Sequence, residues 1–178
     1  NMTSACGVVE QVHTEETGLY EGRVDRNTRA ALKSQKAITV KFVEGKTINR
    51  ACVEEVEKAL SIEGRHTYLY APADGEITMV FDTLHAVTMT TTQGIEVLIH
   101  IGLDTVNLKG EPFTAHVKAG DKVKQGDLLM DVDLGKIQAA GLNIITPVLI
   151  CNTDAYPTFK THVGKDVTND DVVLELGK

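Results

Sequence analysis

Two histidines, His85 and His100, stand out because each interrupts an apolar stretch of the chain. His100 lies in the run Leu-Ile-His-Ile-Gly-Leu-Asp-Thr-Val at 98–106, and His85 in Phe-Asp-Thr-Leu-His-Ala-Val at 81–87. Imidazole changes charge near neutral pH and also serves as a nucleophile or metal ligand. If the fold brings these two rings together, the pair could carry a phosphoryl group or bind a metal ion.

A β-hairpin is the element that could bring the two histidines together. Strands near 84–90 and 95–101 flank Thr91 to Gly94, and a two-residue turn at Gln93-Gly94 sets residue 87 opposite His100. A turn one residue earlier sets His85 directly opposite His100. Both registers keep the two rings on one face, whereas a three-residue loop would separate them, because a one-residue slip reverses every side chain.

The same register predicts the surroundings of the rings. One face of the second strand is a core row, and the other carries His100 in a shallow apolar patch, which keeps an imidazole neutral. Thr83 could hydrogen-bond the His85 ring, and Asp104 could do the same near His100. The predicted core row is Ile95, Val97, Ile99 and Ile101; the predicted histidine face is Glu96, Leu98 and His100, with Val87 and Met89 across.

Three chemistries fit this pattern. One imidazole could accept a phosphoryl group while the other donates a hydrogen bond to its oxygens. The spacing of His100 and Asp104 also resembles that of lysostaphin-type zinc peptidases, but those need a later His-x-His, and His116 and His162 are solitary. The glycine-punctuated segment 117–129 resembles biotinyl and lipoyl carrier domains, although Lys136 lacks the setting of a cofactor-bearing lysine.

Composition narrows the class of protein. The chain has 178 residues and a net charge of -7, which disfavours binding to nucleic acid. Its longest apolar runs fall short of the roughly 20 residues of a membrane span, which predicts no membrane insertion. Three widely spaced cysteines favour a reducing compartment, and hence a cytoplasmic protein; they are Cys6, Cys52 and Cys151.

Short β-prone runs dominate the chain from residue 67 onward, which predicts an all-β sandwich or barrel. These strands are expected at 67–72, 76–81, 86–90, 128–132, 143–150 and 172–176. Short helices are expected at 134–140 and 53–60, with a charged helical stretch at 23–36. Residues 1–40 form a segment of unknown role, and residues 41–178 form the main domain.

The ordered motifs of residues 67–178 resemble the glucose-type enzyme IIA domain of the bacterial phosphoenolpyruvate-dependent sugar phosphotransferase system. The run around His100, continued to Gly110, is similar to that family's phosphorylation signature, and the segment at His85 is similar to its second-histidine segment. Further matching positions are 71–75, Phe113, Gly120, Val123, 126–127, 146–148 and 152–154. A glycine-acid-glycine element of the family is missing at 61–66.

The resemblance implies an antiparallel β-sandwich of the barrel-sandwich (duplicated hybrid motif) type with short helices. It implies that His100 accepts a phosphoryl group from the carrier HPr and passes it to a cysteine of an enzyme IIB domain of a sugar permease. It also implies that His85 stabilises the phosphoryl group and that Thr83 orients His85. Other positions implied for phosphoryl or partner binding are Gly102, Asp104, Val106, Phe81 and Leu98. Of these, Phe81, Leu98 and Val106 are implied to form an apolar rim for docking partners.

The resemblance implies that the protein requires no cofactor, although His85 and His100 could bind zinc at a partner interface. It also implies that regulated transporters or metabolic enzymes could be further partners. Two alternatives stay open: a regulatory binding module that has lost phosphotransfer, and a zinc-dependent hydrolase. The phosphocarrier interpretation requires that the two rings meet and that His100 be open to a visiting protein.

Overall fold

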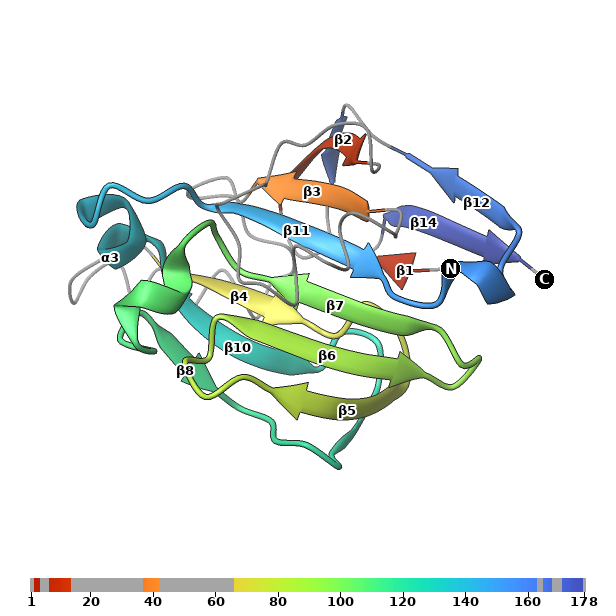
Figure 1. Cartoon of the computed structure of the whole chain (residues 1–178), viewed down its shortest axis with the longest axis horizontal. Coiled ribbons are helices and arrows are strands. Elements are labelled where there is room, and N and C mark those ends of the chain that lie inside the picture. The colour runs from red at the N-terminus through yellow and green to blue at the C-terminus, as the bar shows by residue number, and fades with distance from the viewer. Residues whose placement is uncertain are drawn as a thin grey trace.

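Antiparallel β-strands form three sheets in the computed structural model, which describes residues 2–3, 7–13, 37–41, 66–162, 165–167 and 171–177 (Figure 1). The largest sheet has eight strands in the order β13 (Lys165–Val167), β2 (Gly7–His13), β3 (Ala37–Lys41), β11 (Ile145–Ile150), β7 (Glu96–His100), β6 (Ala86–Thr91), β5 (Gly75–Val80) and β9 (Lys122–Val123). A three-stranded sheet has the order β4 (His66–Tyr70), β10 (Leu128–Asp133) and β8 (Phe113–Ala115). Another has the order β1 (Met2–Thr3), β14 (Val172–Gly177) and β12 (Thr158–Thr161).

The sheets pack through an aliphatic core, as an antiparallel sandwich requires. In Figure 1, β4, β10 and β8 lie behind the strands β5, β6 and β7. Leu129 and Val132 of β10 belong to the same buried cluster as Ile77 of β5 and Met89 of β6. Leu174 of β14 joins that cluster as well. The predicted all-β sandwich is therefore confirmed.

The predicted strands agree with the observed ones from residue 66 onward, within a few residues at each end. The predicted helix at 134–140 is α3 (Leu134–Ala139), whose first turn is capped by Asp133 accepting a hydrogen bond from the Lys136 amide at 3.1 Å. Two 3-10 turns, η1 (Thr105–Leu108) and η2 (Thr153–Ala155), complete the elements. The predicted helices at 23–36 and 53–60 and the divergent stretch at 61–65 lie outside the described residues.

Strands from the first 41 residues enter the same sheet as His100. β3 pairs with β11, with Val40 opposite Thr146, and β2 pairs in turn with β3. The boundary predicted at residue 40 falls within β3, and the division into two parts stays a prediction.

The predicted register of the β6–β7 hairpin is wrong by one residue. Ala86 pairs with His100, and the Thr91 amide donates to the carbonyl of Ile95 at 2.9 Å, which leaves a three-residue loop at 92–94. The loop closes at Gly94, whose φ of 86° suits a three-residue hairpin with a left-handed last residue. In consequence Val87 and Met89 point into the core instead of flanking His100. The predicted core row is confirmed, because all four of its aliphatic residues, which lie in β7 or directly next to it, are buried.

Within the described part of the chain, the model contains no helix with the length and hydropathy that a membrane span needs.

Candidate functional site

The rings of His85 and His100 are in edge-to-face contact, with centroids 4.9 Å apart and planes inclined at 76°. In the observed register a regular strand would place them on opposite faces, but His85 precedes β6. Leu84 has a left-handed φ of 57°, and its amide donates to the Phe81 carbonyl at 2.7 Å, so the chain turns sharply before His85. The His85 carbonyl then accepts from the Ile101 amide at 2.7 Å, which fixes the two segments together. The predicted meeting of the rings is confirmed, but a turn produces it, not the hairpin register.

A backbone carbonyl determines which nitrogen of the neutral His100 ring carries the proton. Nδ1 of His100 lies 2.7 Å from the carbonyl oxygen of Gly102. A carbonyl only accepts hydrogen bonds, so Nδ1 must carry the proton, and in the neutral ring Nε2 holds the lone pair. Asp104 was the sequence-based candidate for a contact at this ring. It instead precedes η1 with a left-handed φ of 60°, and the Gly102 carbonyl takes that place.

Thr83 and Phe81 orient the second ring. The Thr83 hydroxyl is 2.5 Å from Nδ1 of His85, which is the contact expected from the sequence. The Phe81 ring meets the His85 ring edge-on, with centroids 5.3 Å apart. A hydroxyl can donate or accept, so this contact is compatible with either neutral tautomer of His85.

Both imidazoles are buried: His85 is 2% exposed and His100 is 0% exposed. The requirement that His100 be open to a visiting protein is therefore not met in this structure. Any reaction at Nε2 with a group on another protein needs the surrounding side chains to move.

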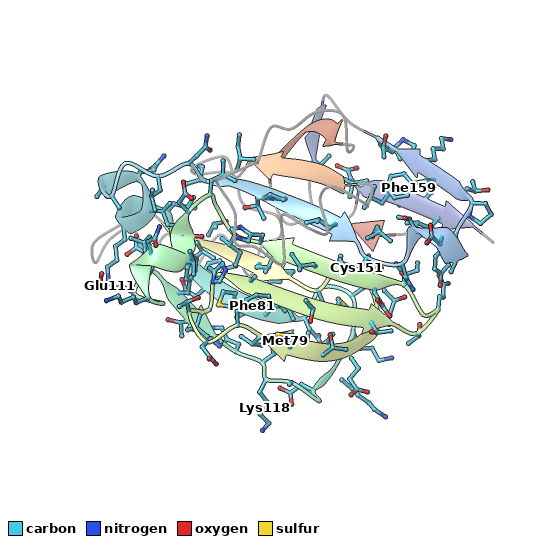
Figure 2. All side chains as sticks on the ribbon, viewed as in Figure 1. Met79, Phe81, Glu111, Lys118, Cys151 and Phe159 are labelled. Atoms are coloured by element: carbon cyan, nitrogen blue, oxygen red, sulfur yellow. The ribbon has the colours of Figure 1, made fainter. Side chains whose placement is uncertain are left out.

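The other predicted site residues divide into two groups. Phe81 and Val106 are half-buried and keep part of their surface exposed. Leu98 is only 6% exposed and packs with Leu103 and Leu149, which corrects its expected place on an exposed rim. The physical reason is that β11 pairs beside β7 with Leu149 directly opposite Leu98, so the two side chains pack together in one buried cluster. Figure 2 shows Phe81 near Met79, just past the end of β5.

Sequence reasoning missed the backbone groups behind His100. The Leu103 amide donates to the carbonyl of Asn143 at 2.9 Å, and the Thr105 hydroxyl donates to the carbonyl of Ile101 at 2.5 Å. A hollow of about 430 Å³ adjoins Leu103 and Asn143. Main-chain carbonyls carry no side-chain signal, so no pattern in the sequence could have identified them.

A zinc site at the pair would need further ligands from nearby side chains. Among the residues that the structure describes, no group of three or more His, Cys, Asp or Glu side chains could hold a metal ion. A catalytic zinc site normally has three protein ligands. The two imidazoles could supply two of them.

Comparisons with known proteins show what this chain is similar to. A family model described as phosphoenolpyruvate-dependent sugar phosphotransferase system, EIIA 1, matches residues 54–156. The glucose-specific EIIA component of Halalkalibacterium halodurans is 50% identical over 106 residues, which are 60% of this chain and 61% of that protein. The β-glucoside-specific EIIBCA component of Bacillus subtilis is 52% identical over 99 residues, which are 56% of this chain and 16% of that protein. The chain thus spans less than two thirds of the length of these relatives.

A solved structure has the same fold. The glucose permease IIA from Mycoplasma capricolum superposes with a TM-score of 0.69, covering 97% of this chain and 92% of that one, at 24% sequence identity. This likeness supports the β-sandwich architecture independently of the sequence motifs.

Proposed function

From the premise that the chain belongs to the EIIA 1 family of the phosphoenolpyruvate-dependent sugar phosphotransferase system, we propose that it is a phosphocarrier in sugar uptake. The observation that carries this proposal is the pair of contacting rings in which a carbonyl holds the proton of His100 on Nδ1. That arrangement leaves the nucleophilic lone pair on Nε2 and sets a second imidazole beside it.

The proposed reaction is a transfer between two imidazoles. The Nε2 lone pair of His100 attacks the phosphorus of a phosphohistidine on HPr, and the bond between that phosphorus and the HPr nitrogen breaks, its electron pair returning to the HPr ring. The positive charge on the newly phosphorylated His100 ring is favoured by the Gly102 carbonyl at Nδ1. In the second step a cysteine thiolate of an enzyme IIB domain displaces His100 from phosphorus.

His85 stabilises the phosphoryl oxygens in this proposal. If the Thr83 hydroxyl donates to Nδ1 of His85, the His85 proton resides on Nε2, where it can donate to an oxygen of the phosphoryl group. A preorganised donor of this kind lowers the barrier to transfer, because negative charge shifts onto those oxygens. Gly102 contributes its carbonyl, Asp104 and Val106 continue the same loop, and Phe81 presents apolar surface to a partner.

The proposal also covers the cellular location of the protein and its partners. We place the protein in the cytoplasm, with HPr as donor, an enzyme IIB domain as acceptor, and transporters or metabolic enzymes as regulated targets. Zinc could bind to His85 and His100 when a partner supplies the remaining ligands.

Phosphoryl uptake tests the proposal directly. A phosphoenolpyruvate-driven HPr system should add about 80 Da to the wild type, the mass of one phosphoryl unit on a histidine nucleophile. His100→Ala should add nothing. His85→Gln should still gain the mass but should pass it on to an enzyme IIB domain at least about tenfold more slowly, because the stabilising donor is gone. Uptake by His100→Ala but not by His85→Gln would reverse the two roles.

The complete burial of His100 favours one alternative, a regulatory binding module that keeps the fold without phosphotransfer. The two functions differ in one measurement. A folded wild type that gains no mass from phosphorylated HPr, yet binds HPr in a pull-down, is the regulatory module.

A further inference from the structure

The peptide between Gly102 and Leu103 is held at both of its polar ends. Its carbonyl oxygen accepts from Nδ1 of His100 at 2.7 Å, and its amide donates to the carbonyl of Asn143 at 2.9 Å. The two groups of one peptide point in opposite directions, since the peptide bond is planar and trans. Whatever fixes the amide therefore also fixes the carbonyl that faces the histidine.

Neighbouring groups pack closely against this peptide at Gly102. Gly102 has a left-handed φ of 73°, and a Cβ atom there would lie 2.6 Å from Cγ2 of Thr105 and 2.9 Å from the Asn143 carbonyl oxygen. Both distances are too short for a methyl group. The loop at Asn143 thus packs against the peptide and does not simply hydrogen-bond to it.

The side chain of Asn143 shapes the backbone that makes this contact. Its Oδ1 accepts a hydrogen bond from the Ile145 amide at 2.9 Å, which is an Asx turn. Such a turn restricts the backbone torsion after the Asn143 Cα atom, and that torsion aims its carbonyl oxygen. The side chain is exposed and lines the hollow of about 430 Å³, so changing it removes no core packing.

We propose that Asn143 is a positioning residue for His100, acting through the Gly102–Leu103 peptide to keep the proton on Nδ1 and the nucleophilic lone pair on Nε2. This role deepens the proposed phosphocarrier function and rests on it for its consequence, but the tautomer of His100 is a property of the protein alone. Asn143 touches no reacting atom, and its effect is on the orientation and protonation of the ring.

The test is the ring nitrogen spectrum of His100 in uniformly ¹⁵N-labelled protein at a pH where the ring is neutral, assigned with His100→Gln. Wild type should show Nδ1 protonated. Asn143→Ala loses the Asx turn, so a detectable share of the ring should move its proton to Nε2. Asn143→Asp keeps an acceptor for the Ile145 amide and should retain the wild-type spectrum. Asp121→Ala removes a comparable contact, to the Lys118 amide, in a turn that does not touch the site, and serves as the control.

Phosphoryl uptake from HPr gives the second readout. Asn143→Ala should slow uptake by about tenfold, the size of effect that follows when a hydrogen bond orienting a reacting group is lost, with Asn143→Asp and Asp121→Ala within about twofold of wild type. An unchanged His100 spectrum in Asn143→Ala would overturn the inference, whatever the uptake rate. If wild type takes up no phosphoryl group, the proposed function fails, and the spectra still decide the positioning role.

Discussion

At the scale of single residues, the chemistry of the pair depends on which nitrogen of each ring holds a proton. For His100 the acceptor is a carbonyl and the tautomer follows from geometry. For His85 the neighbour is a hydroxyl, which adapts to either tautomer. In the proposed mechanism, a hydroxyl at that place lets His85 donate to a phosphoryl oxygen without a buried charge beside it.

Thr83 therefore has a role that can be separated from packing. Thr83→Val keeps the shape but cannot hydrogen-bond to Nδ1 of His85, and we expect onward phosphoryl transfer to fall by about tenfold. Thr83→Ser keeps the hydroxyl and should stay within about threefold of wild type. Rapid-quench transfer to an enzyme IIB domain measures both. In a His85→Gln background Thr83→Val should have no added effect, since the two residues act as one unit; additive losses would show that Thr83 acts elsewhere.

Cys151 is a second residue whose environment predicts its behaviour. Burial raises the pKa of its thiol, and the nearby carboxylate of Glu96 raises it further. Only the thiolate reacts with alkylating reagents, so a raised pKa means less reactive thiolate at any pH below it. Iodoacetamide at pH 8 should label Cys151 several-fold more slowly in the folded protein than in urea, as followed by peptide mass spectrometry. Glu96→Gln should partly restore the rate, and equal folded and unfolded rates would contradict this account.

At the scale of elements, the sequence predicted the strands but not the turns between them. The runs at 86–90 and 128–132 are readable because they are short, mainly apolar stretches, the second of which directly follows the turn signal Gly126-Asp127. The hairpin loop was not readable, because Gly94 suits both a two-residue turn and the observed three-residue loop. The turn at Leu84 was missed for a related reason: a leucine with positive φ carries no local signal, and tertiary contacts impose it.

The turn η1 also depends on positive φ angles that the sequence does not signal, and the backbone strain at one of them can be tested directly. It is flanked by two non-glycine residues with left-handed φ, Asp104 at 60° and Lys109 at 54°. Lys109 is exposed, so Lys109→Gly relieves the backbone without removing packing. We expect unfolding free energy to rise by about 0.5–1 kcal/mol, because the left-handed conformation costs more than the extra chain entropy of glycine. Lys109→Ala keeps the Cβ atom and should give no gain in urea denaturation. Equal effects of the two substitutions would mean that backbone strain is not the cause.

At the scale of the whole molecule, the largest buried cluster is shared by all three sheets and includes Ile99 and Ile101 on either side of His100. The buried cluster joins Leu129 of β10, Val97 of β7 and Leu174 of β14, so strands that are far apart in the chain support one another. β14 pairs with both β1 and β12, which ties the last described strand to the first. This arrangement predicts that the described part of the chain unfolds as one cooperative unit.

Leu174→Ala tests that cooperativity. Leu174 is completely buried, and truncating such a side chain leaves a cavity that should lower the free energy of unfolding by about 2–5 kcal/mol. Leu176, in the same strand, is only partly buried, so Leu176→Ala should cost clearly less. Because the core is shared, the ring signals of His85 and His100 should disappear at the same urea concentration as the far-ultraviolet circular dichroism of the sheets, and both midpoints should shift together in Leu174→Ala. A histidine pair whose signals persist after the circular dichroism has changed would show that the site folds on a smaller core than the one described.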